Sequence, residues 1–142
     1  MREYTFDQLE IGQTEHFSRI ITLEMEHAFR EISGDENPLH LDDDFARKSG
    51  DGKFRSHVTF GMLTASLYST MAGMYLPGKY SLIHSLENIS FQQPVFAGDE
   101  LTVTGKVVDK DDNLRLLRLK VIIKNQAQKV VSKAIMKVMV LR

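Results

Sequence analysis

The segment from Ile32 to His40 carries the residues best suited to chemistry. It reads Ile-Ser-Gly-Asp-Glu-Asn-Pro-Leu-His and places the carboxylate of Asp35 five positions before the imidazole of His40. Both side chains are common proton-transfer groups in enzymes. Gly34 and Pro38 constrain the backbone by opposite means, since glycine adopts left-handed conformations and proline fixes φ. The pattern therefore predicts a general acid/base pair on a constrained loop, and hence an enzyme.

Two helices are expected to flank this loop. Thr22 suits the N-cap of a helix over about 23–32, which should end at Gly34. A second helix should start near Asp42 and stop at Gly50, because acidic residues favour a helix N-terminus. The aspartates at positions 42–44 could instead form a metal cluster. Consecutive carboxylates on a helix do not face one point, so we expect no metal site.

The rest of the chain predicts one helix and a sheet. Residues 61–75 are nearly uncharged, which predicts a helix that is buried on all sides and ends before Leu76-Pro77-Gly78. Alternation of apolar and polar residues predicts strands over about 81–91, 100–109, 114–125 and 128–140, with a short strand at 17–21. We therefore expect an α+β fold in which an antiparallel sheet of about five strands wraps around the helix.

Composition narrows the possible classes of protein. A chain of 142 residues predicts a single domain, 1–142. Without a long apolar run or a signal-peptide pattern, we expect a cytoplasmic location and no membrane partner. The absence of cysteine excludes thiolate nucleophiles, disulfides and cysteine-based metal sites.

The charge is unevenly distributed along the chain. Residues 106–142 hold ten bases and three acids, which could attract DNA or the phosphates of a smaller ligand. The bases alternate with apolar residues, as on the solvent face of a half-buried sheet. We therefore expect no nucleic-acid partner.

Three segments of the chain resemble the MaoC-like dehydratases, the (R)-specific enoyl-CoA hydratases of the hot-dog fold. The first is Phe29 to His40, which contains Ser-Gly-Asp-x-Asn-Pro-Leu-His and is followed by Ala46. The second is Gly61 to Ser66. The third is Phe91 to Leu101, which marks the fold more than the chemistry. The weaker pattern Leu-Glu-Ile-Gly-Gln at 9–13 also fits. The resemblance covers nearly the whole chain, and its first motif is highly specific.

The resemblance implies a fold, an assembly and a set of site residues. It implies a hot-dog domain with a helical overhang that carries the catalytic loop, and a homodimer with acyl-CoA along the subunit interface. Asp35 and His40 become the catalytic pair, and Gly61 becomes the oxyanion donor through its backbone N–H. The residues expected to contact the substrate are Asn37, Phe60, Met62 and Ser69.

One departure from the family pattern stands beside the proposed oxyanion donor. Members of the family usually have His-Gly where this chain has Phe60-Gly61. The backbone donor survives this change, but the preceding imidazole does not. His57, three residues earlier, is a candidate to replace it.

The implied reaction is the reversible hydration of a trans-2-enoyl-CoA to an (R)-3-hydroxyacyl-CoA with a short to medium acyl chain. Asp35 is expected to act as general base while His40 orients the water. This chemistry requires no metal or redox cofactor. The alternatives are a 3-hydroxyacyl-carrier-protein dehydratase or a subunit of one, an acyl-CoA thioesterase, and a non-catalytic acyl-CoA binding module.

Overall fold

The computed structural model describes residues 1–142 and contains a five-stranded antiparallel sheet in the order β1-β3-β4-β5-β2. The strands are β1 (Thr14–Ile20), β2 (Ser81–Phe91), β3 (Glu100–Asp111), β4 (Leu116–Lys124) and β5 (Val130–Val140). All five expected strands are confirmed. β4 and β5 begin two residues later than predicted, because Arg115 and Gln128 adopt left-handed backbone conformations that belong to the preceding turns.

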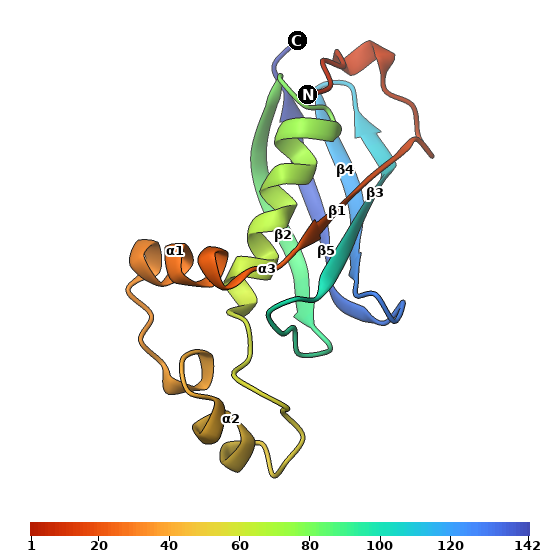
Figure 1. Cartoon of the computed structure of the whole chain (residues 1–142). Helices are drawn as coiled ribbons and strands as arrows, with labels where there is room; N and C mark the ends of the chain where they lie inside the picture. Colours follow the sequence, from red (N-terminus) through yellow and green to blue (C-terminus); the bar gives the residue numbers. More distant parts are fainter.

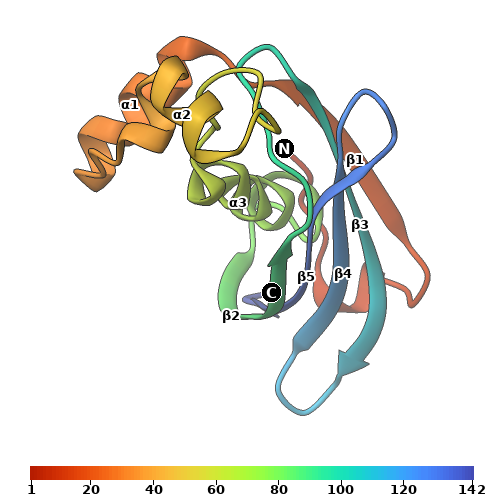
Figure 2. The same ribbon diagram turned by 90° about the horizontal axis from the view of Figure 1, so that it is seen from below.

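Helix α3 (Gly61–Thr70) lies along the concave face of the sheet and continues into a π-helical turn over Met71–Tyr75 (Figures 1 and 2). The helix approaches the sheet closely at Gly105, where an added Cβ would lie 2.7 Å from the Met71 sulfur. Around this contact lies the core formed by one face of the central strands, including Leu101, Val103, Val107, Leu117, Leu119, Val121, Ile123, Met136 and Val138. This arrangement confirms the expected α+β hot-dog fold.

The prediction that this helix is buried on all sides is wrong for one face. Met62 is 61% exposed, and Ser66 and Ser69, one and two turns further along, are also exposed. The sheet covers α3 from one side only, and β2 is an edge strand with Leu86 and Phe91 exposed. Apolar surface on α3 and β2 is therefore left open.

The overhang consists of α1 (Leu23–Ser33), the 3₁₀ turn η2 (Pro38–His40) and α2 (Asp43–Ser49), and it projects beyond the end of α3 (Figure 1). As predicted, the hydroxyl of Thr22 caps α1, Gly34 ends it with φ of 70°, and Asp42 caps α2. A further 3₁₀ turn, η1 (Phe6–Gln8), precedes β1. No helix of the molecule is both long enough and apolar enough to cross a membrane.

Asp99, in the turn between β2 and β3, fastens the overhang to the sheet. Its carboxylate is 4% exposed and accepts hydrogen bonds from Arg55 Nη2 at 3.1 Å, Gln126 Nε2 at 2.9 Å and the Phe96 N–H at 2.9 Å. Arg55 lies in the segment between α2 and α3, and Gln126 lies in the turn between β4 and β5. This buried side chain thus joins three segments that are distant in sequence.

Candidate active site

Three side chains shape the loop between α1 and η2 in the same way. Ser33 Oγ accepts the N–H of Asp35 at 3.2 Å, Asp35 Oδ1 accepts the N–H of Asn37 at 3.0 Å, and Asn37 Oδ1 accepts the N–H of Leu39 at 3.0 Å. Such bonds to the N–H two residues on are typical of Ser, Asp and Asn in turns. They hold Asp35 in place with one carboxylate oxygen and leave Oδ2 without a protein partner.

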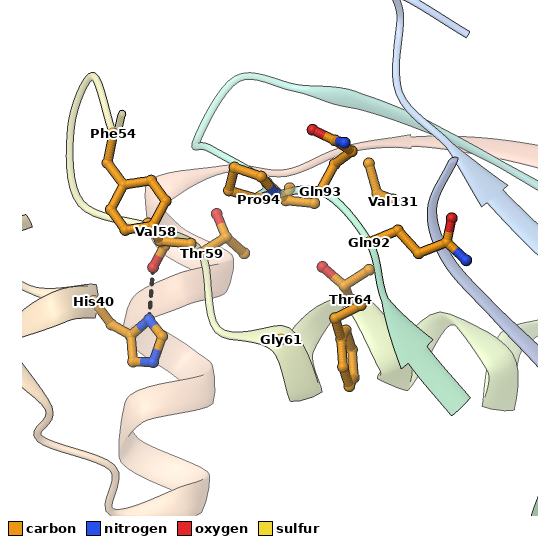
Figure 3. A pocket seen from close by; sticks show the side chains of 12 residues that line it. His40, Phe54, Val58, Thr59, Gly61, Thr64, Gln92, Gln93, Pro94 and Val131 are labelled. Carbon is orange, nitrogen blue, oxygen red and sulfur yellow. Dashed lines mark hydrogen bonds between the residues drawn. The ribbon is translucent and has the colours of Figure 1, made fainter. Parts of the chain in front are cut away.

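His40 is oriented by the backbone of the segment that leads into α3. Its Nδ1 lies 2.6 Å from the carbonyl oxygen of Val58. Figure 3 marks this hydrogen bond with a dashed line. Its ring packs against that of Phe60, with the ring centroids 4.4 Å apart. Because the carbonyl can only accept a hydrogen bond, the neutral ring carries its proton on Nδ1. Nε2 is then an acceptor.

Asp35, His40 and Gly61 meet at one cavity of about 260 Å³. Phe29, Ser33, Phe60, Met62 and Phe91 complete its lining. A second cavity of about 280 Å³ also reaches His40, Gly61 and Phe91, so the two adjoin at these residues. It extends between the overhang and the sheet (Figure 3), where its further lining residues are Phe54, Val58, Thr59, Thr64, Gln92, Gln93, Pro94, Val95 and Val131.

The N-terminus of α3 is uncapped where it enters these cavities. Thr22, Asn37 and Asp42 each cap a helix or 3₁₀ turn of the overhang with a side-chain oxygen, whereas the N-cap of α3 is Phe60, which has none. No protein acceptor binds the N–H of Gly61. A free N–H at the positive end of a helix dipole favours an oxygen that carries negative charge.

The model of the MaoC like domain matches residues 8–131. The chain belongs to the MaoC-like domain family. It is 37% identical to an (R)-specific enoyl-CoA hydratase of Aeromonas caviae over 91% of this chain and 95% of that protein. It is 33% identical to a 3-hydroxybutyryl-CoA dehydratase of Methylorubrum extorquens over 84% of this chain and 73% of that protein.

A solved structure supports the same assignment. The (R)-hydratase from A. caviae involved in PHA biosynthesis superimposes with a TM-score of 0.85 at 34% identity, over 93% of this chain and 97% of that chain. The MaoC-like fold is therefore shared over nearly the full length of both proteins.

Two of the residues predicted for the MaoC-like site lie outside both cavities. Asn37 is exposed, and its side-chain oxygen is bound to the Leu39 N–H. Ser69 lies on the exposed face of α3, seven residues after Met62. Asn37 thus shapes the loop, and Ser69 lies two turns along α3 from Met62, beyond the cavity that Asp35 and His40 line.

Phe60, where the family usually has histidine, is 2% exposed and lies between two rings. One is His40, and the other is Phe29, whose centroid is 5.1 Å away. His57 does not replace the missing imidazole. Its Nε2 lies 2.8 Å from Glu26 Oε2 and its Nδ1 lies 2.7 Å from Asp43 Oδ1. Both ring nitrogens are thereby committed to structural partners.

Charge pairing changes the protonation of this network. Desolvation favours neutral His57, but its hydrogen bonds to Asp43 and Glu26 outweigh that effect and raise the pKa of His57 above its usual 6.5. The backbone and side-chain hydrogen bonds from His57 lower the pKa of Asp43. His57 therefore joins α1 to the start of α2, and both carboxylates favour its charged form.

The three consecutive aspartates have separate tasks. Asp42 caps α2, Asp43 binds His57, and Asp44 pairs with Arg47 at 3.1 Å. No three carboxylate or imidazole side chains of the molecule are arranged to hold a metal ion.

Proposed function

We propose that this MaoC-like protein catalyses the reversible hydration of trans-2-enoyl-CoA to (R)-3-hydroxyacyl-CoA. One observation carries the proposal: Asp35, His40 and the uncapped N-terminus of α3 at Gly61 line the same cavity. Hydration needs a base for water and a donor for the thioester oxygen, and the cavity offers both. The similarity to hydratases and dehydratases that act on CoA thioesters supports this choice.

The two free acceptors of the loop suit the attacking water. A water molecule that donates one hydrogen to Asp35 Oδ2 and the other to His40 Nε2 has its lone pairs free for C3 of the enoyl group. Asp35 acts as general base and takes the first proton, while His40 orients the water and shares the transfer. The hydroxyl adds to C3, and the abstracted proton returns to C2 through the same pair. The reaction needs no metal or redox cofactor.

The oxyanion donor is assigned to Gly61. As water attacks C3, negative charge develops on the thioester oxygen, and the free Gly61 N–H stabilises it there. Glycine at this position allows close approach of the ligand. Phe60 and Met62, which line the cavity on either side of Gly61, contact the substrate beside its reacting atoms.

The exposed apolar face of α3 and β2 supports a homodimer. Leu86 and Phe91 lie on β2, whose outer edge has no strand partner, while Met62 lies on α3. A second copy paired at this edge would cover the apolar residues and satisfy the open backbone groups. Acyl-CoA then lies along the subunit interface, where Ser69, on the exposed face of α3, contacts it. The cytoplasmic location stays a prediction.

Turnover of crotonyl-CoA tests the proposal. We expect 3-hydroxybutyryl-CoA of R configuration and no release of free CoA. Free thiol without the hydroxyacyl product would instead indicate a thioesterase. Faster turnover of the matching acyl-carrier-protein thioester would indicate a carrier-protein dehydratase, and saturable binding without turnover would indicate a binding module.

A further inference from the structure

Thr64 lines the cavity that extends away from Asp35, and its buried hydroxyl is unpaired. The residue is 2% exposed, and its Oγ1 has no hydrogen-bond partner. Threonine within a helix can bond a carbonyl three or four residues earlier. Here the Phe60 carbonyl accepts the N–H groups of Leu63 and Thr64 instead. Figure 3 shows the side chain directed from α3 into the cavity.

The surrounding wall offers this hydroxyl nothing to bind. Val58, Pro94, Val95 and Val131 contribute apolar surface. Thr59 is also buried, but its hydroxyl donates to Glu26 Oε1. Gln92 and Gln93 lie at the exposed end of the cavity. Thr64 is thus the one buried polar side chain of this lining that has no hydrogen-bond partner.

The position of the cavity indicates which part of a substrate would enter it. His40 and Gly61 line both cavities, so a substrate with its thioester oxygen at Gly61 has C3 at their junction. The acyl chain beyond C3 then extends into the cavity that contains Thr64. A plain alkyl chain would leave the buried hydroxyl unpaired, whereas an oxygen substituent on the chain would supply its missing hydrogen bond.

Building on the proposed hydration, we infer that the preferred substrate carries an oxygen substituent on its acyl chain beyond C3 and that Thr64 binds this oxygen. The hydroxyl of threonine can donate and accept, so it fits a hydroxyl or a keto group. Thr64 is then a specificity-determining residue. Asp35, His40 and Gly61 perform the reaction on either kind of chain.

The test compares trans-2-hexenoyl-CoA with its 5-hydroxy and 6-hydroxy derivatives in the wild type, Thr64→Val and Thr64→Ser. For at least one hydroxylated substrate, kcat/KM of the wild type should exceed that for hexenoyl-CoA by about tenfold, the effect of one hydrogen bond. Thr64→Ser should keep the preference. Thr64→Val, which has nearly the same shape, should abolish or reverse it.

Thermal melting without substrate gives a second readout. Thr64→Val should melt at a higher temperature than the wild type, because it removes a buried hydroxyl without a partner. A wild type that turns over hexenoyl-CoA at least as well as both hydroxylated substrates would overturn the inference and leave hydration intact. So would equal effects of Thr64→Val on all three. Failure to hydrate any of them would instead refute the proposed function.

Discussion

His40 donates its Nδ1–H to the carbonyl oxygen of Val58, with 2.6 Å between nitrogen and oxygen. This bond fixes both the ring orientation and the tautomer, which leaves the lone pair of Nε2 available. Asp35 is organised similarly, since Oδ1 accepts the Asn37 N–H and Oδ2 has no protein partner. In each residue of the pair, one side-chain atom is therefore hydrogen-bonded to the protein backbone, and a second atom is free to bind water.

Substitutions that keep the hydrogen bonds of Asp35 and His40 to the backbone should test their catalytic roles without disturbing the loop. In Asp35→Asn the amide oxygen can still accept the Asn37 N–H, and in His40→Asn the amide nitrogen can still donate to Val58. Each should reduce kcat/KM for crotonyl-CoA hydration by about 10²–10⁴-fold, the usual contribution of acid/base catalysis. His40→Ala should abolish hydration too. Wild-type activity in a variant with an unchanged melting temperature would refute that residue's role.

Gly61→Ala should separate catalysis from folding. The added Cβ would lie 3.4 Å from Phe91 Cε1, in the wall shared by both cavities, and alanine favours the helix. We expect an unchanged melting temperature with hydration reduced by about 10²-fold, because the methyl group would hold the thioester oxygen away from the backbone N–H. Ser66→Ala, on the same helix but outside both cavities, is the control and should remain active. Equal activity of the two variants would argue against an oxyanion site at Gly61.

Phe60→His restores the residue usual in the family but should not suit this chain. The new ring would place a polar nitrogen between the aromatic rings of Phe29 and His40, in a site only 2% exposed. We expect the free energy of unfolding to fall by about 1–3 kcal/mol, measured in urea. Phe60→Leu, which adds no polar atom, should cost less. Wild-type stability of Phe60→His would show that the site supplies a partner for the imidazole.

The His57 network should make stability depend on pH. Because the pKa of His57 is raised on folding, its contribution is fully present below the usual value of 6.5 and is lost as pH rises through the raised value. Urea unfolding of the wild type and His57→Gln at pH 6 and pH 9 measures this. The difference in free energy of unfolding between the wild type and the variant should be smaller at pH 9 than at pH 6. An equal change in the free energy of unfolding of both proteins between the two pH values would show that the pairing of charged His57 adds no stability.

Leu86→Lys should break the proposed dimer. It places a charge on the exposed apolar face of β2, where burial against a second copy would leave the charge unpaired. Light scattering should report a monomer, with hydration lost. Leu114→Lys is the matched control, because Leu114 is 60% exposed in the turn between β3 and β4, away from this face. A fully active Leu86→Lys monomer would place the CoA site within one subunit.

Local patterns predicted most of the fold. The alternation of apolar and polar residues located all five strands, and the caps at Thr22, Gly34 and Asp42 located the ends of the overhang helices. These signals involve neighbouring residues only. The open face of α3 was missed, because the small residues Ser66 and Ser69 are equally compatible with a covered helix face and an uncovered one.

The site was predictable where its side chains lie close together in sequence. The motif from Gly34 to His40 indicated the acid/base pair, but the acceptor that orients His40 is the backbone of Val58, and a carbonyl leaves no residue-type signal. The pairing of Glu26 with His57 spans 31 positions, so only the folded chain brings them together. The sequence likewise does not reveal that the Thr64 hydroxyl lacks a partner, because this depends on which residues the fold places around it.

The bonds made by the side chains of Ser33, Asp35 and Asn37 involve only the backbone from Asp35 to Leu39. The bend that presents the carboxylate is therefore encoded within seven consecutive residues. Apart from the ion pair between Glu36 and Arg30 of α1, the loop draws its shape from its own side chains. Substitutions in α1 and α2 that leave these residues intact should therefore preserve the bend.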